Sequence, residues 1–259
     1  MYFFIIKQVM KIIIVCCTFI LLTAFNAKAQ TTKNTQQLNQ AWLAYFNQTR
    51  LSEKWGIWTD LQLRTKEDFV NNLSLSIVRV GVTYYIADNI RLTAGYAWAN
   101  YFPGDNHKNI SQTEHRPWQQ FQWDAKYGRK RMVHWIRLEE RFRHKILNDD
   151  ALADGYNFNY RIRYNWRYEL PLDKKANAPG ATTFIINDEI NVNAGKQIVY
   201  NYFDQNRFYA GLKIQLTAVS NLQFGYLNVF QQLAAGSQFK NVNALRLSYY
   251  QSIDLRHHS

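Results

Sequence analysis

The chain alternates apolar and polar residues over long stretches, most strictly between residues 156 and 170. In YNFNYRIRYNWRYEL, aromatic and aliphatic residues occupy every even position, and Asn, Arg or Glu occupies every odd one. Successive side chains of a β-strand leave on opposite faces, so this stretch predicts a strand with one apolar and one polar face. The alternation alone does not say which face meets water, a protein core or lipid.

The same pattern recurs in blocks that are separated by turn residues. The predicted strands span 40–51, 55–65, 73–86, 90–102, 115–127, 131–146, 156–170, 181–193, 205–217, 222–233 and 241–254. They are 11 to 16 residues long, whereas ordinary strands have about 5–6 residues and a tilted transmembrane strand needs about 9–11. Short turns alternate with longer links such as PGDNHKNISQTE, as in outer-membrane barrels. We therefore predict an all-β fold, a transmembrane antiparallel up-and-down β-barrel.

The number of strands does not follow directly from the blocks. Bacterial single-chain barrels usually have an even number of strands, so eleven blocks predict about 12 strands, with 10 as the alternative. A missed strand would lie near 30–40 or inside 170–181. Within 73–86 the apolar positions change parity, which predicts a β-bulge. The apolar residues on the two sides of that change are Leu73, Leu75 and Ile77, then Val78, Val80 and Val82.

The N-terminus has the three parts of a secretory signal peptide. Lys7 and Lys11 precede an apolar stretch over 12–24, and Ala27-Lys28-Ala29 forms a small-x-small cleavage site. We predict a signal peptide over 1–29, a single barrel domain over 30–259, and export to the outer membrane of a Gram-negative envelope. The rival interpretation is an N-terminal membrane anchor.

Composition and charge narrow the predicted partners. The chain has a formal charge of +12, which becomes +9 without the three lysines of the predicted signal peptide, and 16% of its residues are aromatic. Its two cysteines lie inside that signal peptide, so disulfides would not hold the exported chain together. For an exported basic protein we expect outer-membrane lipid and lipopolysaccharide as partners, and no nucleic acid.

Several segments resemble a known family. EHRPWQQFQW, RLEERFRHKI and FDQNRFYAGLKIQ, followed by LQFGYLNVFQQ, are similar to the family called domain of unknown function 2490. The resemblance extends over essentially the whole chain after the predicted signal peptide. The resemblance implies an outer-membrane β-barrel, and it implies no particular activity.

If the apolar positions face outward, a charge network faces the lumen. The predicted network consists of Asp60, Arg79, Arg91, Arg116, Asp124, Arg137, Glu139, Arg141, Arg161, Arg163, Arg167, Glu169, Glu189 and Arg207. The same face receives Arg64, Arg143 and Lys213. These groups could pair with one another and fill the lumen, or they could line a small anion-favouring pore or uptake channel, with a small anionic solute as its cargo.

Two further alternatives stay open. A hydrolase that modifies outer-membrane lipid would need a serine beside a histidine, and Ser111, Glu114 and His115 share one predicted junction between a loop and a strand. A soluble secreted β-barrel binding protein would instead bury the aromatic face of 156–170. The sequence predicts no catalytic residue, metal or cofactor, and it leaves the oligomeric state open. Trp118 is expected inside, and Trp123 and Phe121 outside.

Overall fold

A computed structural model describes residues 33–104, 107–174 and 178–256. The predicted signal peptide lies outside these residues. Eleven β-strands occur in the described part of the chain. They are β1 (Asn34–Arg50), β2 (Trp55–Glu67), β3 (Asn71–Ala87), β4 (Ile90–Tyr101), β5 (Gln112–Tyr127), β6 (Lys130–Ile146), β7 (Leu152–Pro171), β8 (Thr182–Ala194), β9 (Phe203–Gln215), β10 (Ser220–Gln232) and β11 (Gln238–Asp254). Each of the eleven predicted blocks corresponds to one of these strands.

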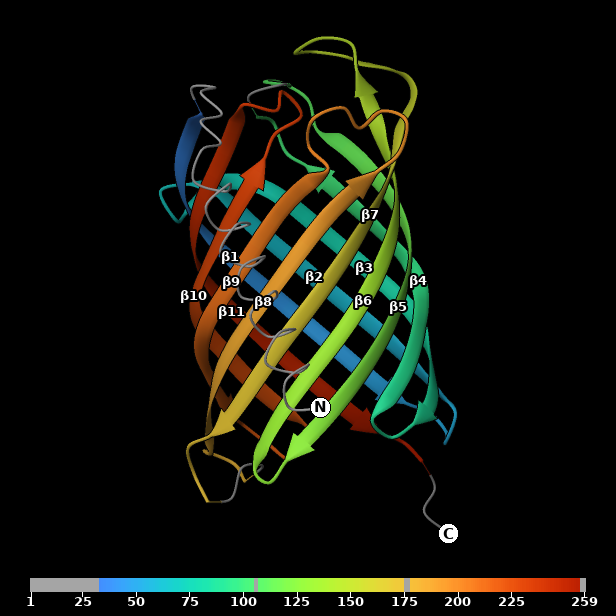
Figure 1. Cartoon of the computed structure of the whole chain (residues 1–259), viewed down its shortest axis with the longest axis vertical. Helices are drawn as coiled ribbons and strands as arrows, with labels where there is room; N and C mark the ends of the chain where they lie inside the picture. Colours follow the sequence, from blue (N-terminus) through green and yellow to red (C-terminus); the bar gives the residue numbers. More distant parts are fainter. Residues whose placement is uncertain (1–32, 105–106, 175–177, 257–259) are drawn as a thin grey trace, which may run out of the picture. The chain divides into compact units, whose positions relative to one another are not determined.

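The strands form one closed barrel in chain order (Figure 1). Consecutive strands pair antiparallel, whereas β1 pairs with β11 in parallel, from Asn34 opposite Gln238 to Arg50 opposite Asp254. The predictions of 12 or 10 strands and of a purely antiparallel barrel are therefore wrong for the described residues. In an up-and-down chain with an odd number of strands the first and the last run in the same direction, so the closing pair must be parallel. Residues 34–40 belong to β1 itself, and between 170 and 181 the described residues hold only the end of β7 and part of a loop.

The alternation of β7 separates the two faces of the wall. Tyr160, Ile162 and Tyr164 point outward and are 40–46% exposed, whereas Arg161 and Arg163 point inward and are buried. The aromatic face is thus on the outside of the barrel, contrary to the soluble binding-barrel alternative. Trp118 is buried inside as predicted, and Phe121 is exposed on the outer wall.

The predicted bulge in the middle of β3 is absent. Ile77 pairs with Gln62 and Val78 with Leu61 without a shift of register, and the irregularities lie nearer the strand ends. The apolar residues change parity for another reason. The inner face of β3 is apolar in its first half, and the outer face is apolar further along the strand. Leu75 and Ile77 point inward and pack in a buried cluster with Ala97, Ala99 and Trp118. Val78, Val80 and Val82 are exposed on the outer wall.

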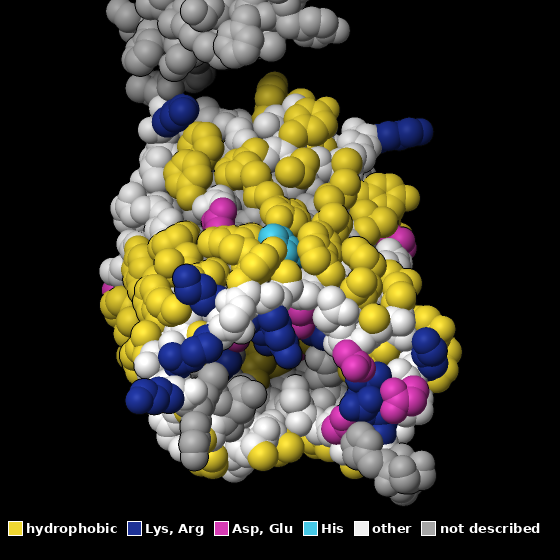
Figure 2. All heavy atoms as spheres, turned by 60° about the horizontal axis from the view of Figure 1, so that its bottom comes forward, with side chains coloured by type: hydrophobic (Ala, Val, Ile, Leu, Met, Phe, Trp, Pro, Cys, Tyr) yellow, Lys and Arg dark blue, Asp and Glu magenta, His cyan; other side chains and the backbone are white. Residues whose placement is uncertain are grey.

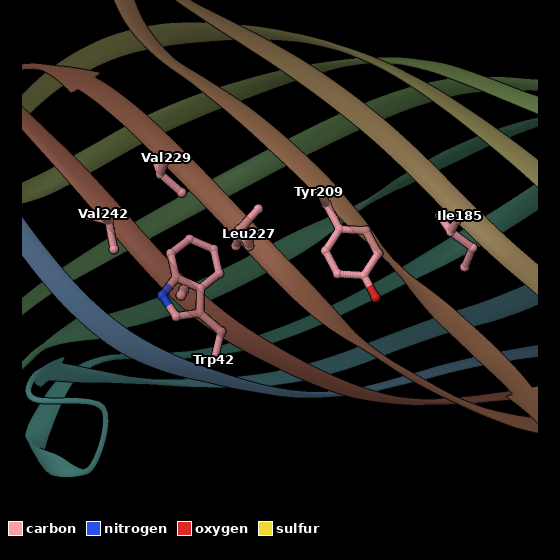
Figure 3. Close-up of a cluster of buried hydrophobic side chains, with 7 residues drawn as sticks. Trp42, Ile185, Tyr209, Leu227, Val229 and Val242 are labelled. Atoms are coloured by element: carbon pink, nitrogen blue, oxygen red, sulfur yellow. The ribbon is translucent and has the colours of Figure 1, made fainter.

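Two aromatic side chains inside the barrel lie on pairs of glycines. Gly81 pairs with Gly95, and a Cβ atom added to Gly81 would lie 2.9 Å from Cζ2 of Trp118. On the other side Gly211 pairs with Gly225, and a Cβ atom added to Gly211 would lie 2.3 Å from the hydroxyl of Tyr209. Glycine lets the ring contact the backbone at these points of the curved wall. Tyr209 belongs to the second buried cluster, formed with residues of β1, β8, β10 and β11 (Figure 3).

Replacing Gly95 by alanine is expected to destabilise the barrel. The new Cβ atom would lie 2.1 Å from the carbonyl oxygen of Val80 and 2.6 Å from Cα of Gly81, both of which are backbone atoms. Forced overpacking of this kind costs about 1–3 kcal/mol, which urea unfolding of the refolded protein would measure. Gly104→Ala is the control, because its nearest atom would be 3.7 Å away. An equal effect of the two substitutions would contradict the close packing at Gly95.

The connections distinguish the two ends of the barrel. We call the end with 51–54, 88–89, 128–129, 172–181 and 216–219 the short-turn end, and the end with 68–70, 102–111, 147–151, 195–202 and 233–237 the long-loop end. The predicted alternation of short and long links describes most of them. The exceptions are 68–70, which is short, and 172–181, which is long.

Candidate functional site

The inner face of the barrel carries a buried network of arginines and carboxylates. All fourteen residues of the predicted luminal network lie on this face, ten of them buried and the others, Arg91, Asp124, Arg167 and Arg207, with side chains at most 14% exposed. The reason is the alternation within each strand: the charged residues occupy the positions between the outward apolar residues, so their side chains point inward. The structure divides them into several ion-pair clusters.

Glu114 is the centre of the cluster nearest the long-loop end. It lies at the start of β5 and is fully buried. Its carboxylate accepts hydrogen bonds from Arg116 at 2.5 Å, from Arg141 at 2.6 and 3.0 Å and from Arg143 at 2.6 Å. The hydroxyl of Tyr101 accepts from Arg116 and Arg143 at 2.7 and 2.9 Å. One carboxylate thus holds three guanidinium groups, and the phenol oxygen satisfies part of their remaining donors.

Glu139 connects the strands in the middle of the barrel. Its two oxygens accept from Nε of Arg161 at 3.0 Å and from Nη1 of Arg163 at 2.6 Å. Arg163 continues to Glu189 at 2.8 Å, and Arg161 continues to Asp204 at 2.9 Å. The chain of charge-assisted hydrogen bonds therefore runs from β6 through β7 to β8 and β9.

Asp60 pairs with Arg79, which also lies 3.9 Å from Glu139. The two carboxylate oxygens lie 2.9 and 2.8 Å from Nη1 of Arg79. They also accept from Nε1 of Trp58 at 2.8 Å and from Nε2 of Gln62 at 3.0 Å. The buried charge of Asp60 is thus compensated and its oxygens are satisfied, as a buried carboxylate requires.

Carboxylates near the short-turn end form the remaining pairs. Glu169 lies 2.8 Å from Nε of Arg167 and 3.0 Å from Nζ of Lys213. Asp124 pairs with Arg131 and lies 3.8 Å from Arg91.

At the same end Arg50, the last residue of β1, donates to Asp88 of the turn 88–89 at 2.6 Å. This side-chain hydrogen bond holds the pKa of Asp88 below its ordinary value. Lys and Arg side chains also gather at this end of the surface in Figure 2.

Cations outnumber carboxylates around an internal cavity of about 440 Å³. The cationic side chains that line it are Arg64, Arg79, Arg91, Arg116, Arg131, Arg137, Arg141, Arg143, Arg161, Arg163, Arg167, Arg207, Lys213 and Arg246. Of the network's carboxylates, only Glu169 and Glu189 also line the cavity. Asp60, Glu114, Asp124, Glu139 and Asp204 take part in ion pairs without lining it. The cavity therefore presents mainly guanidinium groups.

Sequence reasoning missed four members of this inner face. Glu114 fell one residue outside the predicted strand 115–127, although its parity matches that of Arg116. Arg131 and Arg246 lie at inward positions that were not considered. Asp204 has the opposite parity to Arg207, yet it is buried beside Gln205, next to a register shift between β8 and β9. Alternation alone does not indicate Asp204.

In the described residues no hydrogen bond joins Ser111 to His115, the serine and histidine of the lipid-hydrolase alternative. Glu114 is inside the barrel, whereas the ring of His115 is on the outer wall, where it is hydrogen-bonded to the hydroxyl of Tyr96 and lies 5.5 Å from the ring of Tyr156. Glu114 and His115 therefore belong to opposite faces of β5, and Glu114 cannot orient this imidazole.

The acidic loop 147–151 contacts the loop 102–111 through its side chains. Asp149 pairs with Lys108 at 3.3 Å, and Asp150 accepts from Asn109 at 2.5 Å. The described residues contain no group of three or more His, Cys, Asp or Glu side chains that could hold a metal ion. In the same residues, no helix is both long and apolar enough to span a membrane.

Comparisons with known proteins give a family match and a similar protein, neither of which has a stated function. A family model described as "Protein of unknown function (DUF2490)" matches residues 39–240. An uncharacterised protein of Methylorubrum extorquens is 25% identical over 186 residues, which are 69% of this chain and 73% of that protein.

Proposed function

This chain belongs to the DUF2490 family, and we propose that it is an integral outer-membrane protein whose barrel is closed to ion flow by its own luminal charge network. The outer wall supports the location, and the inner face supports the closed lumen.

The observation that carries the location is the apolar outer wall. Large apolar side chains are exposed on every strand, among them Leu43, Leu61, Val80, Leu92, Phe121, Ile136, Ile162, Ile190, Phe208, Phe224 and Leu247. Figure 2 shows such side chains over much of the visible wall. Soluble monomers rarely expose continuous apolar patches beyond a few hundred Å², whereas a barrel in a bilayer needs an apolar band about 25 Å tall.

Aromatic residues at both ends of the wall support the same location. Trp55, Tyr84 and Tyr127 are exposed near the short-turn end, and Tyr156 and Phe230 are exposed near the long-loop end. Aromatic girdles at the two membrane interfaces are typical of transmembrane barrels. The predicted signal peptide would deliver the chain to that membrane.

The buried ion pairs support the proposal of a closed lumen. A barrel of eleven strands is only somewhat wider than the eight-stranded barrels whose side chains fill the interior. Here Glu139 of β6 pairs with Arg161 and Arg163 of β7 at middle height. It also lies 3.9 Å from Arg79 of β3, which pairs with Asp60 of β2, so the ion pairs link strands that are not neighbours in the wall. Moving an ion through this region would require breaking buried, charge-assisted contacts.

We expect the refolded protein to produce no discrete conductance steps in a planar bilayer. Insertion would be established separately by protease protection of protein in vesicles. Discrete steps that favour anions would contradict a closed lumen and support a small anion-favouring pore, the second candidate. The specific observation in favour of that pore is the excess of arginine around the cavity.

A further inference from the structure

The positive charge inside the barrel exceeds what its carboxylates compensate. Thirteen arginines and Lys213 line the cavity, whereas the buried ion pairs of the described residues involve seven carboxylates, Asp60, Glu114, Asp124, Glu139, Glu169, Glu189 and Asp204. Guanidinium groups stay protonated. Like charges that are partly withdrawn from water repel strongly, so such a cavity attracts anions.

Arg64 is the clearest uncompensated charge. It forms no ion pair with any described residue. Its guanidinium carbon lies 3.6 Å from the ring centroid of Trp42, and one of its nitrogens donates to Gln62 at 3.3 Å. Its Nε is buried and has no hydrogen-bond partner.

Arg207 approaches the same tryptophan from another strand. Its guanidinium carbon lies 5.5 Å from the Trp42 ring centroid, and Arg207 acts on Arg64 as a repelling charge. The nearest carboxylate of Arg207 is Glu189, at 3.3 Å, which Arg163 contacts more closely at 2.8 Å. Two arginines with little compensation thus flank one indole ring beside the cavity.

Unpartnered polar groups extend the same region. Arg246 of β11 is paired in register with Trp42, and it also forms no ion pair with any described residue. Its guanidinium lies 3.8 Å from the ring centroid of Tyr209. Nε of Arg246, the hydroxyl of Tyr209 and the hydroxyl of Ser248 are buried without hydrogen-bond partners.

We propose that the lumen beside Trp42 is a binding site for a small oxyanion, held by the guanidinium groups of Arg64 and Arg207 with Arg246 as a neighbouring charge. The ligand class is phosphate, sulfate or the carboxylate of a small solute, because a guanidinium donates two parallel hydrogen bonds to such groups. The site depends on the charges of the inner face alone. It would remain even if the barrel conducts ions or lies outside a membrane.

The test is calorimetric titration of the full mature chain, refolded in detergent, with inorganic phosphate, sulfate and acetate at constant ionic strength. Chloride serves as the reference anion. We expect saturable binding of at least one oxyanion, and an affinity about tenfold weaker in Arg64→Gln, because one charge-assisted fork is lost. Arg129→Gln removes the same charge from an exposed turn and should bind like the wild type.

Several results would overturn the site. Absence of oxyanion binding by the wild type would exclude it. Thermal stabilisation by phosphate, sulfate and acetate that is no greater than that by chloride would also exclude it, because it would reflect general screening. Equal phosphate affinity in Arg64→Gln and the wild type would place the anion elsewhere. Arg64→Lys, which keeps the charge and loses the fork, should bind with intermediate affinity. The wild-type titration decides the matter even if a variant does not fold.

Discussion

Replacing Glu139 by glutamine is expected to lower the free energy of unfolding by about 3–5 kcal/mol, the usual cost of removing one partner of a buried ion pair. Glu139 is 1% exposed. Its oxygens pair with Arg161 and Arg163, and Arg79 and Arg137 lie 3.9 Å away. The glutamine side chain is neutral, so these guanidinium groups would lose the negative charge that β6 supplies to them. Urea unfolding in detergent micelles, followed by tryptophan fluorescence, measures the effect.

The adjacent residue provides a matched control. Glu140 points to the outer wall, where it is only partly exposed and forms no ion pair with a described residue. Glu140→Gln removes the same charge one position away without breaking an ion pair, so we expect it to lower the stability far less than Glu139→Gln does. Equal losses for the two substitutions would mean that the ion pairs of Glu139 do not hold the barrel together.

Arginine in place of Ile162 is expected to destabilise the barrel in a lipid bilayer by about 2–4 kcal/mol, the range for a charge on the lipid face near the midplane. Ile162 lies in the middle part of β7 and is 46% exposed on the outer wall. On a water-exposed wall the same substitution would change stability by no more than about 0.5 kcal/mol. The measurement is reversible unfolding from lipid vesicles, compared with the wild type.

Depth provides the control for this second substitution. Tyr127 is 61% exposed at the short-turn end of β5, where a new arginine would cost about 0–1 kcal/mol in a membrane interface. If Ile162→Arg and Tyr127→Arg both leave the stability unchanged, the outer wall does not contact hydrocarbon, and the proposed location is wrong.

The strands and their faces were predictable because alternation is a local property. The predicted block 156–170 lies inside β7, Leu152–Pro171, with the predicted side chains on each face. The contacts inside the barrel were harder to predict from the sequence. That Glu139 pairs with Arg161 and Arg163, while Glu114 pairs with Arg141 and Arg143, depends on register between strands. Parity gives the face of a residue and not its partner.

Non-local features of the wall were also missed. The parallel pairing of β1 with β11 joins the two ends of the described chain, and no short segment encodes it. The inward position of Asp204 depends on a shift in pairing between β8 and β9. The sequence pattern near Leu75 was interpreted as a bulge. Apolar residues that pack inside the barrel change the parity of the pattern in the same way as an inserted residue does.

The parallel seam between β1 and β11 has a consequence for the order of folding. Along this seam Tyr45 donates to Gln251, which is 206 positions away in sequence. Every other strand pair joins sequence neighbours, so hairpins can form as soon as their two strands are available, whereas closure must wait for the last strand. Contacts of such long range are slow to form because the intervening chain must be ordered first. Until β11 arrives, β1 and β10 are open edges that can pair with other chains, so a chain truncated before Gln238 should aggregate rather than form a smaller barrel.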